Sequence, residues 1–69
     1  MSKKYGVIAI DTITSQVDTI DLFDMYYNAI QCMIKTASSE QEQTINSEDV
    51  IDNELSFKDG ELLYKIIEF

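Results

Sequence analysis

The stretch ELSFKDGELLYKI, residues 54–66, decides the fold. At its centre Asp59-Gly60 separates two runs of β-forming residues, and this pair is typical of a two-residue type I′ hairpin turn because Asp and Gly tolerate positive φ. Such a turn fixes the register and places Glu54 opposite Lys65. Opposite charges at facing positions stabilise a strand pair. The sequence therefore predicts a C-terminal β-hairpin in this register.

The same register sorts the apolar side chains of the hairpin onto two faces. Phe57 falls beside Leu62 on the face that a helix would cover. The apolar residues expected on that face are Ile51, Leu55, Phe57, Leu62, Tyr64 and Ile66. Those expected on the other face are Val50, Leu63, Ile67 and Phe69. A strand that is apolar on both faces is usually covered on both sides, so the last strand is predicted to lie in the middle of the sheet.

Two further elements are predicted before the hairpin. Residues 4–10 are rich in β-formers and predict a first strand. Residues 18–38 predict an amphipathic helix with Asp18 as N-cap, and residues 36–49 predict a flexible acidic loop. The expected fold class is α+β, a single βαββ domain over residues 1–69. In it, one amphipathic helix packs on a three-stranded sheet in the order first, third, second strand.

The composition excludes several functions. The chain has 69 residues, with 13 acidic side chains, 5 lysines, no His and one Cys, and its formal charge is -8. Without His and with a single Cys it has no usual zinc site, no His-based triad and no internal disulfide. Its negative charge makes it a poor direct binder of nucleic acid or anionic membranes. No run is apolar enough for a membrane span or signal peptide, and the single Cys fits a reducing compartment, so we expect a cytoplasmic protein.

Three motifs with possible chemistry are better explained by structural roles. Asp11 ends the first strand, where an acid can bind a metal. No Gly-rich loop or second carboxylate accompanies it. The favoured interpretation is an Asp that starts a polar turn, and metal binding stays open. Cys32 has no adjacent cation to lower its pKa, so we expect an unreactive residue at the helix border. Phe23, Tyr26 and Tyr27 have helical spacing and are expected in the core. We therefore predict no catalytic residue, metal or cofactor.

The negative charge itself is the remaining candidate for a functional feature. Three aspartates recur at three-residue intervals along the predicted helix, about 5 Å apart along its axis, and further acids follow in the loop. Such a row approaches the charge density of a nucleic-acid backbone and would steer the protein toward a basic groove. The alternative is that the acids only keep a small protein soluble. The expected partner-binding residues are Asp18, Asp21, Asp24, Glu48, Asp49 and Asp52.

A second surface is expected on the side of the sheet away from the helix. A chain of this size buries only about 60% of its unfolded surface, and one helix covers one face of a sheet. Exposed apolar patches of this kind mark association sites. We therefore expect a homodimer whose interface contains Leu63, Ile67 and Phe69.

In size, acidity and lack of catalytic residue types, the chain is similar to the small early proteins with which bacteriophages block host defence enzymes, including nucleic-acid mimics. The resemblance is one of composition over the whole chain and involves no sequence motif. It implies a non-catalytic acidic protein that inhibits or modulates a larger, basic, nucleic-acid-handling protein in the host cytoplasm. The alternative function is a small self-associating structural or assembly subunit without an inhibitory role.

Overall fold

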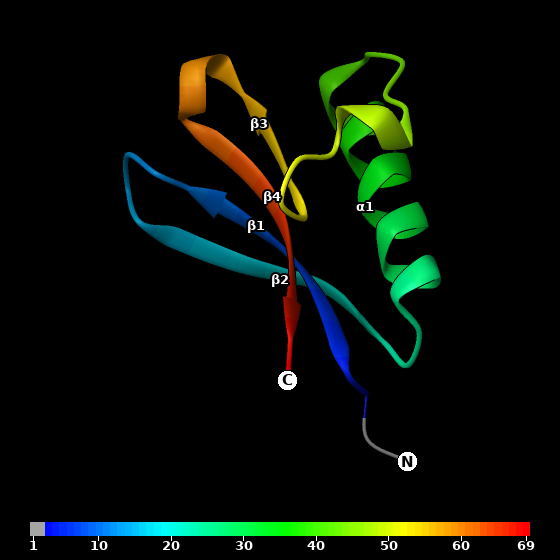
Figure 1. Cartoon of the computed structure of the whole chain (residues 1–69). Helices are drawn as coiled ribbons and strands as arrows, with labels where there is room; N and C mark the ends of the chain where they lie inside the picture. The colour runs from blue at the N-terminus through cyan, green and yellow to red at the C-terminus, as the bar shows by residue number, and fades with distance from the viewer. Residues whose placement is uncertain (1–2) are drawn as a thin grey trace.

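The computed structural model describes residues 3–69 and shows one helix packed on a four-stranded antiparallel sheet (Figure 1). The strands are β1 (Tyr5–Asp11), β2 (Gln16–Phe23), β3 (Glu54–Phe57) and β4 (Leu62–Glu68), and the helix is α1 (Tyr26–Gln41). A short 3₁₀ helix occupies Ser47–Asp49, and Lys58–Gly60 form the turn between β3 and β4. The sheet order is β2-β1-β4-β3. The predicted α+β class is confirmed, with one strand more than expected.

The additional strand is β2, and it corrects the predicted helix boundary. Residues 18–23 belong to this strand, so the helix begins at Tyr26 and Asp18 is not its N-cap. The β2 segment QVDTIDLF contains three β-branched residues, which favour a strand over a helix. At its other end α1 continues to Gln41, so residues 36–41 are helical rather than part of a loop.

The hairpin has the predicted register. Glu54 pairs with Lys65 and Phe57 with Leu62, and the Lys65 ammonium lies 3.8 Å from the Glu54 carboxylate. Asp59 and Gly60 have φ values of 56° and 89°, both positive as a type I′ turn requires. β4 lies between β1 and β3, as its two apolar faces predict. The hairpin prediction is therefore confirmed.

The core lies between α1 and one face of the sheet. Ala29, Met33 and Ala37 recur at four-residue spacing along α1 and are fully buried. They pack against buried residues of β1, β3 and β4, namely Val7, Leu55, Tyr64 and Ile66. The contact stripe of α1 differs from the one expected, because Tyr26 and Tyr27 are 39% and 66% exposed. Phe23, now in β2, does pack against the core.

Two hairpin residues exchange the positions expected for them. Ile51, expected beneath the helix, is 72% exposed, whereas Val50 packs against the core. The reason is a tight turn in which the backbone groups of Ile51 and Glu54 bond to each other, at 3.1 and 3.0 Å. This turn directs Ile51 outward.

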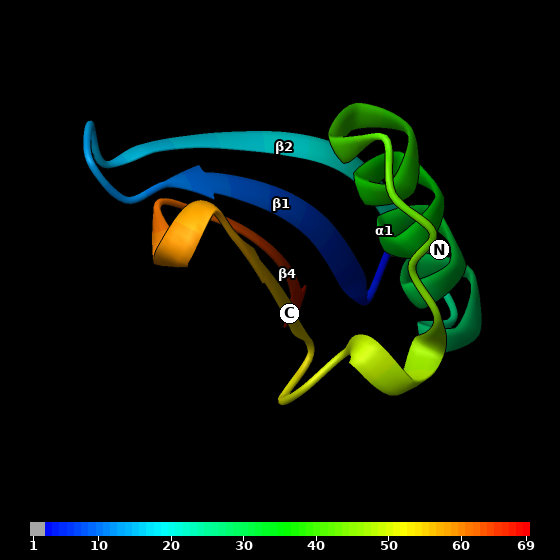
Figure 2. The ribbon, with the colours of Figure 1, turned by 90° about the horizontal axis from the view of Figure 1, so that it is seen from above.

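The sheet is curved, and α1 covers only one end of its strands (Figure 2). The turn between β1 and β2 and the turn between β3 and β4 extend beyond the helix. These two turns are joined by the Thr12 hydroxyl, which donates a hydrogen bond of 2.8 Å to the Gly60 carbonyl. The opposite sheet face has no helix of the described residues on it. We call it the uncovered face.

Candidate functional site

The six acids predicted to contact a partner lie in two groups at opposite edges of the sheet. The β2-edge acids are Asp18, Asp21 and Asp24, and the β3-edge acids are Glu48, Asp49 and Asp52. Because β2 and β3 are the outer strands, three strand spacings, or about 14 Å, separate the two edges. Salt screens charges over about 8 Å at physiological ionic strength. The acids therefore form two groups along the edges of the sheet and not one continuous row.

A bulge gives the β2-edge acids a common direction. In a regular strand, residues three apart point to opposite faces. Here the register shifts between Val7 and Ile8, so that Asp21 pairs with Val7 and Asp18 pairs with Ala9. Val7 is fully buried on the face that α1 covers. Ala9 lies two residues further along β1 and therefore shares this face. Asp18 and Asp21 therefore both lie on the helix side of the sheet, at its outer edge.

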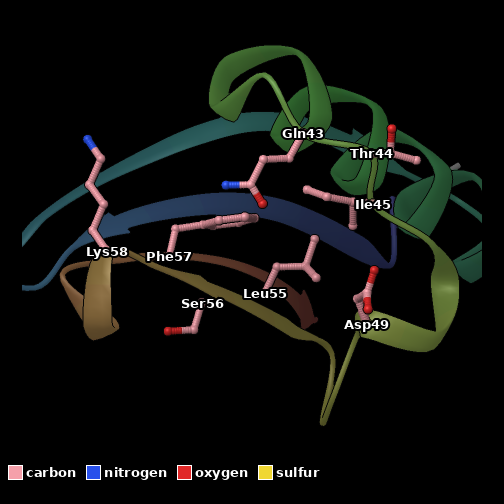
Figure 3. A pocket seen from close by; sticks show the side chains of 8 residues that line it. All are labelled: Gln43, Thr44, Ile45, Asp49, Leu55, Ser56, Phe57 and Lys58. Carbon is pink, nitrogen blue, oxygen red and sulfur yellow. The ribbon is translucent and has the colours of Figure 1, made fainter.

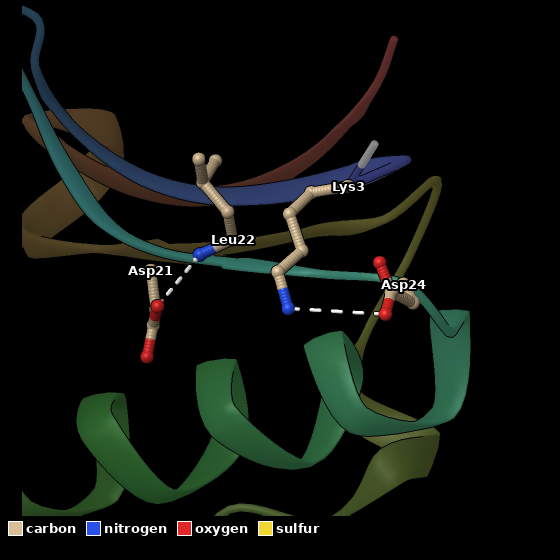
Figure 4. Close-up of polar contacts among 4 residues, drawn as sticks. All are labelled: Lys3, Asp21, Leu22 and Asp24. Atoms are coloured by element: carbon tan, nitrogen blue, oxygen red, sulfur yellow. Dashed lines mark hydrogen bonds and ion pairs between the residues drawn. The ribbon is translucent and has the colours of Figure 1, made fainter. Parts of the chain in front are cut away.

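The β2-edge acids differ in how far their charge is compensated. The Asp21 carboxylate accepts a hydrogen bond of 2.8 Å from the backbone N–H of Leu22, and the Lys3 ammonium lies 3.8 Å from the Asp24 carboxylate (Figure 4). Asp18 is exposed and has neither a hydrogen bond nor an ion pair from its side chain within residues 3–69. Asp18 and Asp21 thus carry the uncompensated charge of this edge.

Two of the β3-edge acids, Asp49 and Asp52, lie beside the exposed apolar residue Ile51. The Asp49 carboxylate accepts a hydrogen bond of 2.9 Å from the Asn46 N–H and so caps the short 3₁₀ helix. Asp52 lies in the tight turn that displays Ile51. A hollow of about 420 Å³ lies here, lined by Asp49, Ile51, Asp52, Glu54 and Ser56. This edge combines negative charge with an apolar anchor, as protein interfaces commonly do.

A second hollow, of about 490 Å³, lies between β3 and the segment that follows α1 (Figure 3). Leu55 and Phe57 project toward that segment, whereas Ser56 points away from it. The hollow is lined by Gln43, Thr44, Ile45, Asp49, Leu55, Ser56, Phe57 and Lys58. Among these eight side chains no nucleophile is joined to a base. The lining supports binding by shape, without assembling an acid–base site.

Asp11 and Cys32 take structural positions. The Asp11 carboxylate accepts hydrogen bonds of 3.0 and 3.2 Å from the backbone N–H groups of Ile13 and Thr14, so it starts the turn after β1. Cys32 is partly buried, with its sulfur 3.9 Å from the Thr36 hydroxyl. Within residues 3–69, no group of three or more His, Cys, Asp or Glu side chains is arranged to hold a metal ion.

One buried polar contact was not predicted from the sequence. The Tyr64 hydroxyl, buried under α1, donates a hydrogen bond to the Glu40 carboxylate and accepts one of 3.3 Å from the Gln41 amide. Burial and the adjacent Glu40 carboxylate raise the pKa of Tyr64 above its ordinary value. The contact anchors the end of α1 to β4, and its only sequence signal is a hydroxyl at a buried hairpin position.

The uncovered face brings together the three residues predicted for an oligomer interface. Leu63 pairs with Ile10 and Ile67 pairs with Gly6, so they share the face of β1 opposite the helix. Phe69 lies against Gly6 on the same face. The apolar residues of this face are Ile8, Ile10, Val17, Leu22, Leu63, Ile67 and Phe69. Sequence reasoning missed Val17 and Leu22 here because it assigned residues 18–38 to a helix and expected no strand over residues 16–23.

Comparison of the chain with protein-family models, with curated proteins and with solved structures finds no match. Among the helices of residues 3–69, none has both the length and the apolar character needed to cross a membrane.

Proposed function

We propose that this protein is a non-catalytic, acidic binding protein that inhibits or modulates a larger, basic, nucleic-acid-handling protein in the cytoplasm. The observation that carries the proposal is the β2 edge, where a bulge turns Asp18 and Asp21 to one side and leaves both exposed. The phage proteins that block host defence enzymes provide the model for such a role. The β3-edge acids, with Ile51 among them, offer a second contact surface.

The charge balance of the whole molecule supports this proposal. The chain has thirteen acidic residues and only five lysines. Within residues 3–69 two ion pairs form, Lys3–Asp24 and Lys65–Glu54, both at 3.8 Å and both substantially exposed to solvent. Exposed pairs of this kind contribute about 0–1 kcal/mol and neutralise little of the surface charge. The remaining acids produce a strong negative field that accelerates association with a basic surface.

The β2-edge acids have a second possible role, because β2 is an outer strand. Charged side chains on edge strands keep sheets from pairing with one another and aggregating. Lysine serves this purpose as well as aspartate does, whereas only aspartate attracts a basic partner. Replacement by lysine therefore separates the two roles.

The test is capture of binding proteins from a cell lysate on immobilised wild-type chain, identified by mass spectrometry. Asp18→Lys, Asp21→Lys is the test variant. Glu42→Lys, Glu61→Lys changes the charge equally at exposed positions outside both acidic groups and is the control. We expect basic nucleic-acid-binding proteins on the wild type and the control, but not on the test variant. Equal retention by all three would refute the β2 edge as the contact surface, and aggregation of the test variant would indicate edge protection.

A small self-associating assembly subunit is the second candidate function. The observation that favours it is the apolar uncovered face, which includes Leu63, Ile67 and Phe69. Salt distinguishes the two candidates, since binding to a basic partner weakens as salt rises, whereas apolar assembly does not.

A further inference from the structure

Apolar side chains converge at one end of the uncovered face, where β1 begins. Gly6 forms the floor of this cluster, because a Cβ atom at this position would lie 3.1 Å from Phe69 Cζ, 3.2 Å from Leu22 Cδ2 and 3.3 Å from Ile67 Cγ1. Leu22 and Phe69 are nevertheless 41% and 69% exposed, and Val17, on the same face but opposite Ile10 toward the other end of β1, is 55% exposed. Three strands, β2, β1 and β4, contribute to one apolar surface that no described element covers.

With the exception of Glu54 in β3, the acids of the strands lie away from this surface. Asp18 and Asp21 share the side of their β1 partners Ala9 and Val7, and the remaining strand acids outside β3, Asp11 and Glu68, also occupy positions on the helix side. Figure 4 shows the side chain of Asp21 on the helix side of β2 and that of Leu22 on the opposite side. The strand charges of the uncovered face are Glu54 and Lys65, which pair with each other. A chain with a net charge of -8 thus has one sheet face with balanced charge.

We infer that the uncovered face packs against the same face of a second copy of the chain. A basic partner would find its complementary charge at the acidic edges, not on this surface. A second copy fits because the face is apolar and self-complementary: Glu54 and Lys65 of one copy meet a surface that carries the same two opposite charges. Two-fold packing of sheet on sheet, about 10 Å apart, buries such faces in many proteins.

The inference does not depend on the proposed function. The acids of β1, β2 and the end of β4 lie on the outer side of the packed sheets, so the dimer leaves both acidic edges exposed on each copy. The two copies still repel each other through their net charge. Added salt screens this repulsion while the apolar contact persists, so the dimer is expected to tighten as salt rises.

The first test is the mass of the full chain in solution, measured by sedimentation equilibrium at micromolar concentrations and moderate salt. We expect twice the 7.9 kDa of one chain. Leu22→Glu, Phe69→Glu places two charges on the uncovered face and should raise the dimer dissociation constant by more than about tenfold. Met25→Glu, Tyr27→Glu is the control, since these residues are 61% and 66% exposed and lie at the start of α1, on the other side of the sheet.

Circular dichroism verifies that each variant is folded. A monomeric wild type would overturn the inference. Equal loss of the dimer in the test and control variants would also overturn it, because it would show that added charge alone separates the copies.

The second test asks whether the molecule that packs against the uncovered face is another copy of the chain. It leaves every apolar side chain in place. Glu54→Lys gives a face with two lysines, and Lys65→Glu gives a face with two glutamates. Each variant alone should dimerise less well than the wild type, and an equimolar mixture should form a heterodimer. If the mixture contains no more dimer than the separate variants, the uncovered faces do not meet.

Discussion

The aromatic ring of Phe69 lies directly on Gly6, close enough that a Cβ atom at position 6 would be 3.1 Å from Phe69 Cζ. Phe69 is thereby held against the start of β1. It completes the apolar cluster of the uncovered face together with Leu22 and Ile67. The cluster depends on the absence of a side chain at residue 6.

Gly6→Ala therefore tests the uncovered face without adding charge. The added methyl group must push Phe69, Leu22 and Ile67 aside by a few tenths of an ångström. Phe69 and Leu22 are exposed and can move, and the loss of unfolded-state freedom contributes about 0.4–1 kcal/mol of stability in the opposite sense. We expect the free energy of unfolding of the monomer, measured in urea, to change by less than about 1 kcal/mol. The dimer dissociation constant, measured by sedimentation, should rise. A dimer of unchanged affinity would show that this cluster is not at the contact.

Core truncation tests the observed packing of α1. Met33 is fully buried, so Met33→Ala should lower the free energy of unfolding by about 2–5 kcal/mol. Tyr27 is 66% exposed, so Tyr27→Ala should lower it by no more than about 0.5 kcal/mol. Chemical denaturation of both variants, at protein concentrations below the dimer dissociation constant, measures the difference in the free energy of unfolding. A larger loss for Tyr27 than for Met33 would mean that the helix face is rotated.

Tyr64→Phe tests the contact between β4 and the end of α1. The variant loses the hydrogen bonds to Glu40 and Gln41 and should be about 1 kcal/mol less stable at neutral pH. In the wild type the pKa of Tyr64 is raised on folding. The folded state therefore retains the proton at a pH where the unfolded chain has lost it, and stability falls as the pH rises above the ordinary tyrosine value of about 10.

The variant should lack this alkaline decline, since it has no group to titrate at residue 64. Unfolding measured at a series of pH values shows the difference between the two proteins. Parallel stability curves for the wild type and Tyr64→Phe above pH 10 would contradict the role assigned to the hydroxyl.

The hairpin could be predicted because its signals are local. Asp59-Gly60 specifies the turn, and the pairing of Glu54 with Lys65 confirms the register. The charge-balanced face also follows from this register, so Leu63 and Ile67 were placed correctly opposite the helix. Their role as an interface remains a prediction.

The start of the helix could not be predicted because a bulge gives β2 the residue spacing of a helix. Asp18, Asp21 and Asp24 recur every three residues, as on one flank of a helix, and apolar residues from Leu22 onward fit the same period. The register shift opposite Val7 and Ile8 produces this spacing within a strand, because it turns Asp21 back to the side of Asp18. A bulge depends on how the strand pairs with its neighbour, here β1, and the periodicity of the β2 segment alone does not reveal it.

The separation of the acids into two groups was also beyond the sequence. Asp18 and Asp52 lie at opposite edges because β2 and β3 flank the two central strands. That order is set by long-range pairing of β1 with β4. The acidic residues could be named from the sequence, but their arrangement required the sheet topology.

The most direct measurement is the salt dependence of affinity for a captured basic partner. It compares three proteins: the wild type, the double variant Asp18→Lys, Asp21→Lys, and the double control variant Glu42→Lys, Glu61→Lys. Between about 50 and about 200 mM salt, we expect the wild type and the control to lose affinity steeply. The test variant should bind at least about tenfold more weakly at low salt and with a shallower slope. Equal affinity and equal slope for all three proteins would contradict an acidic binding surface at the β2 edge.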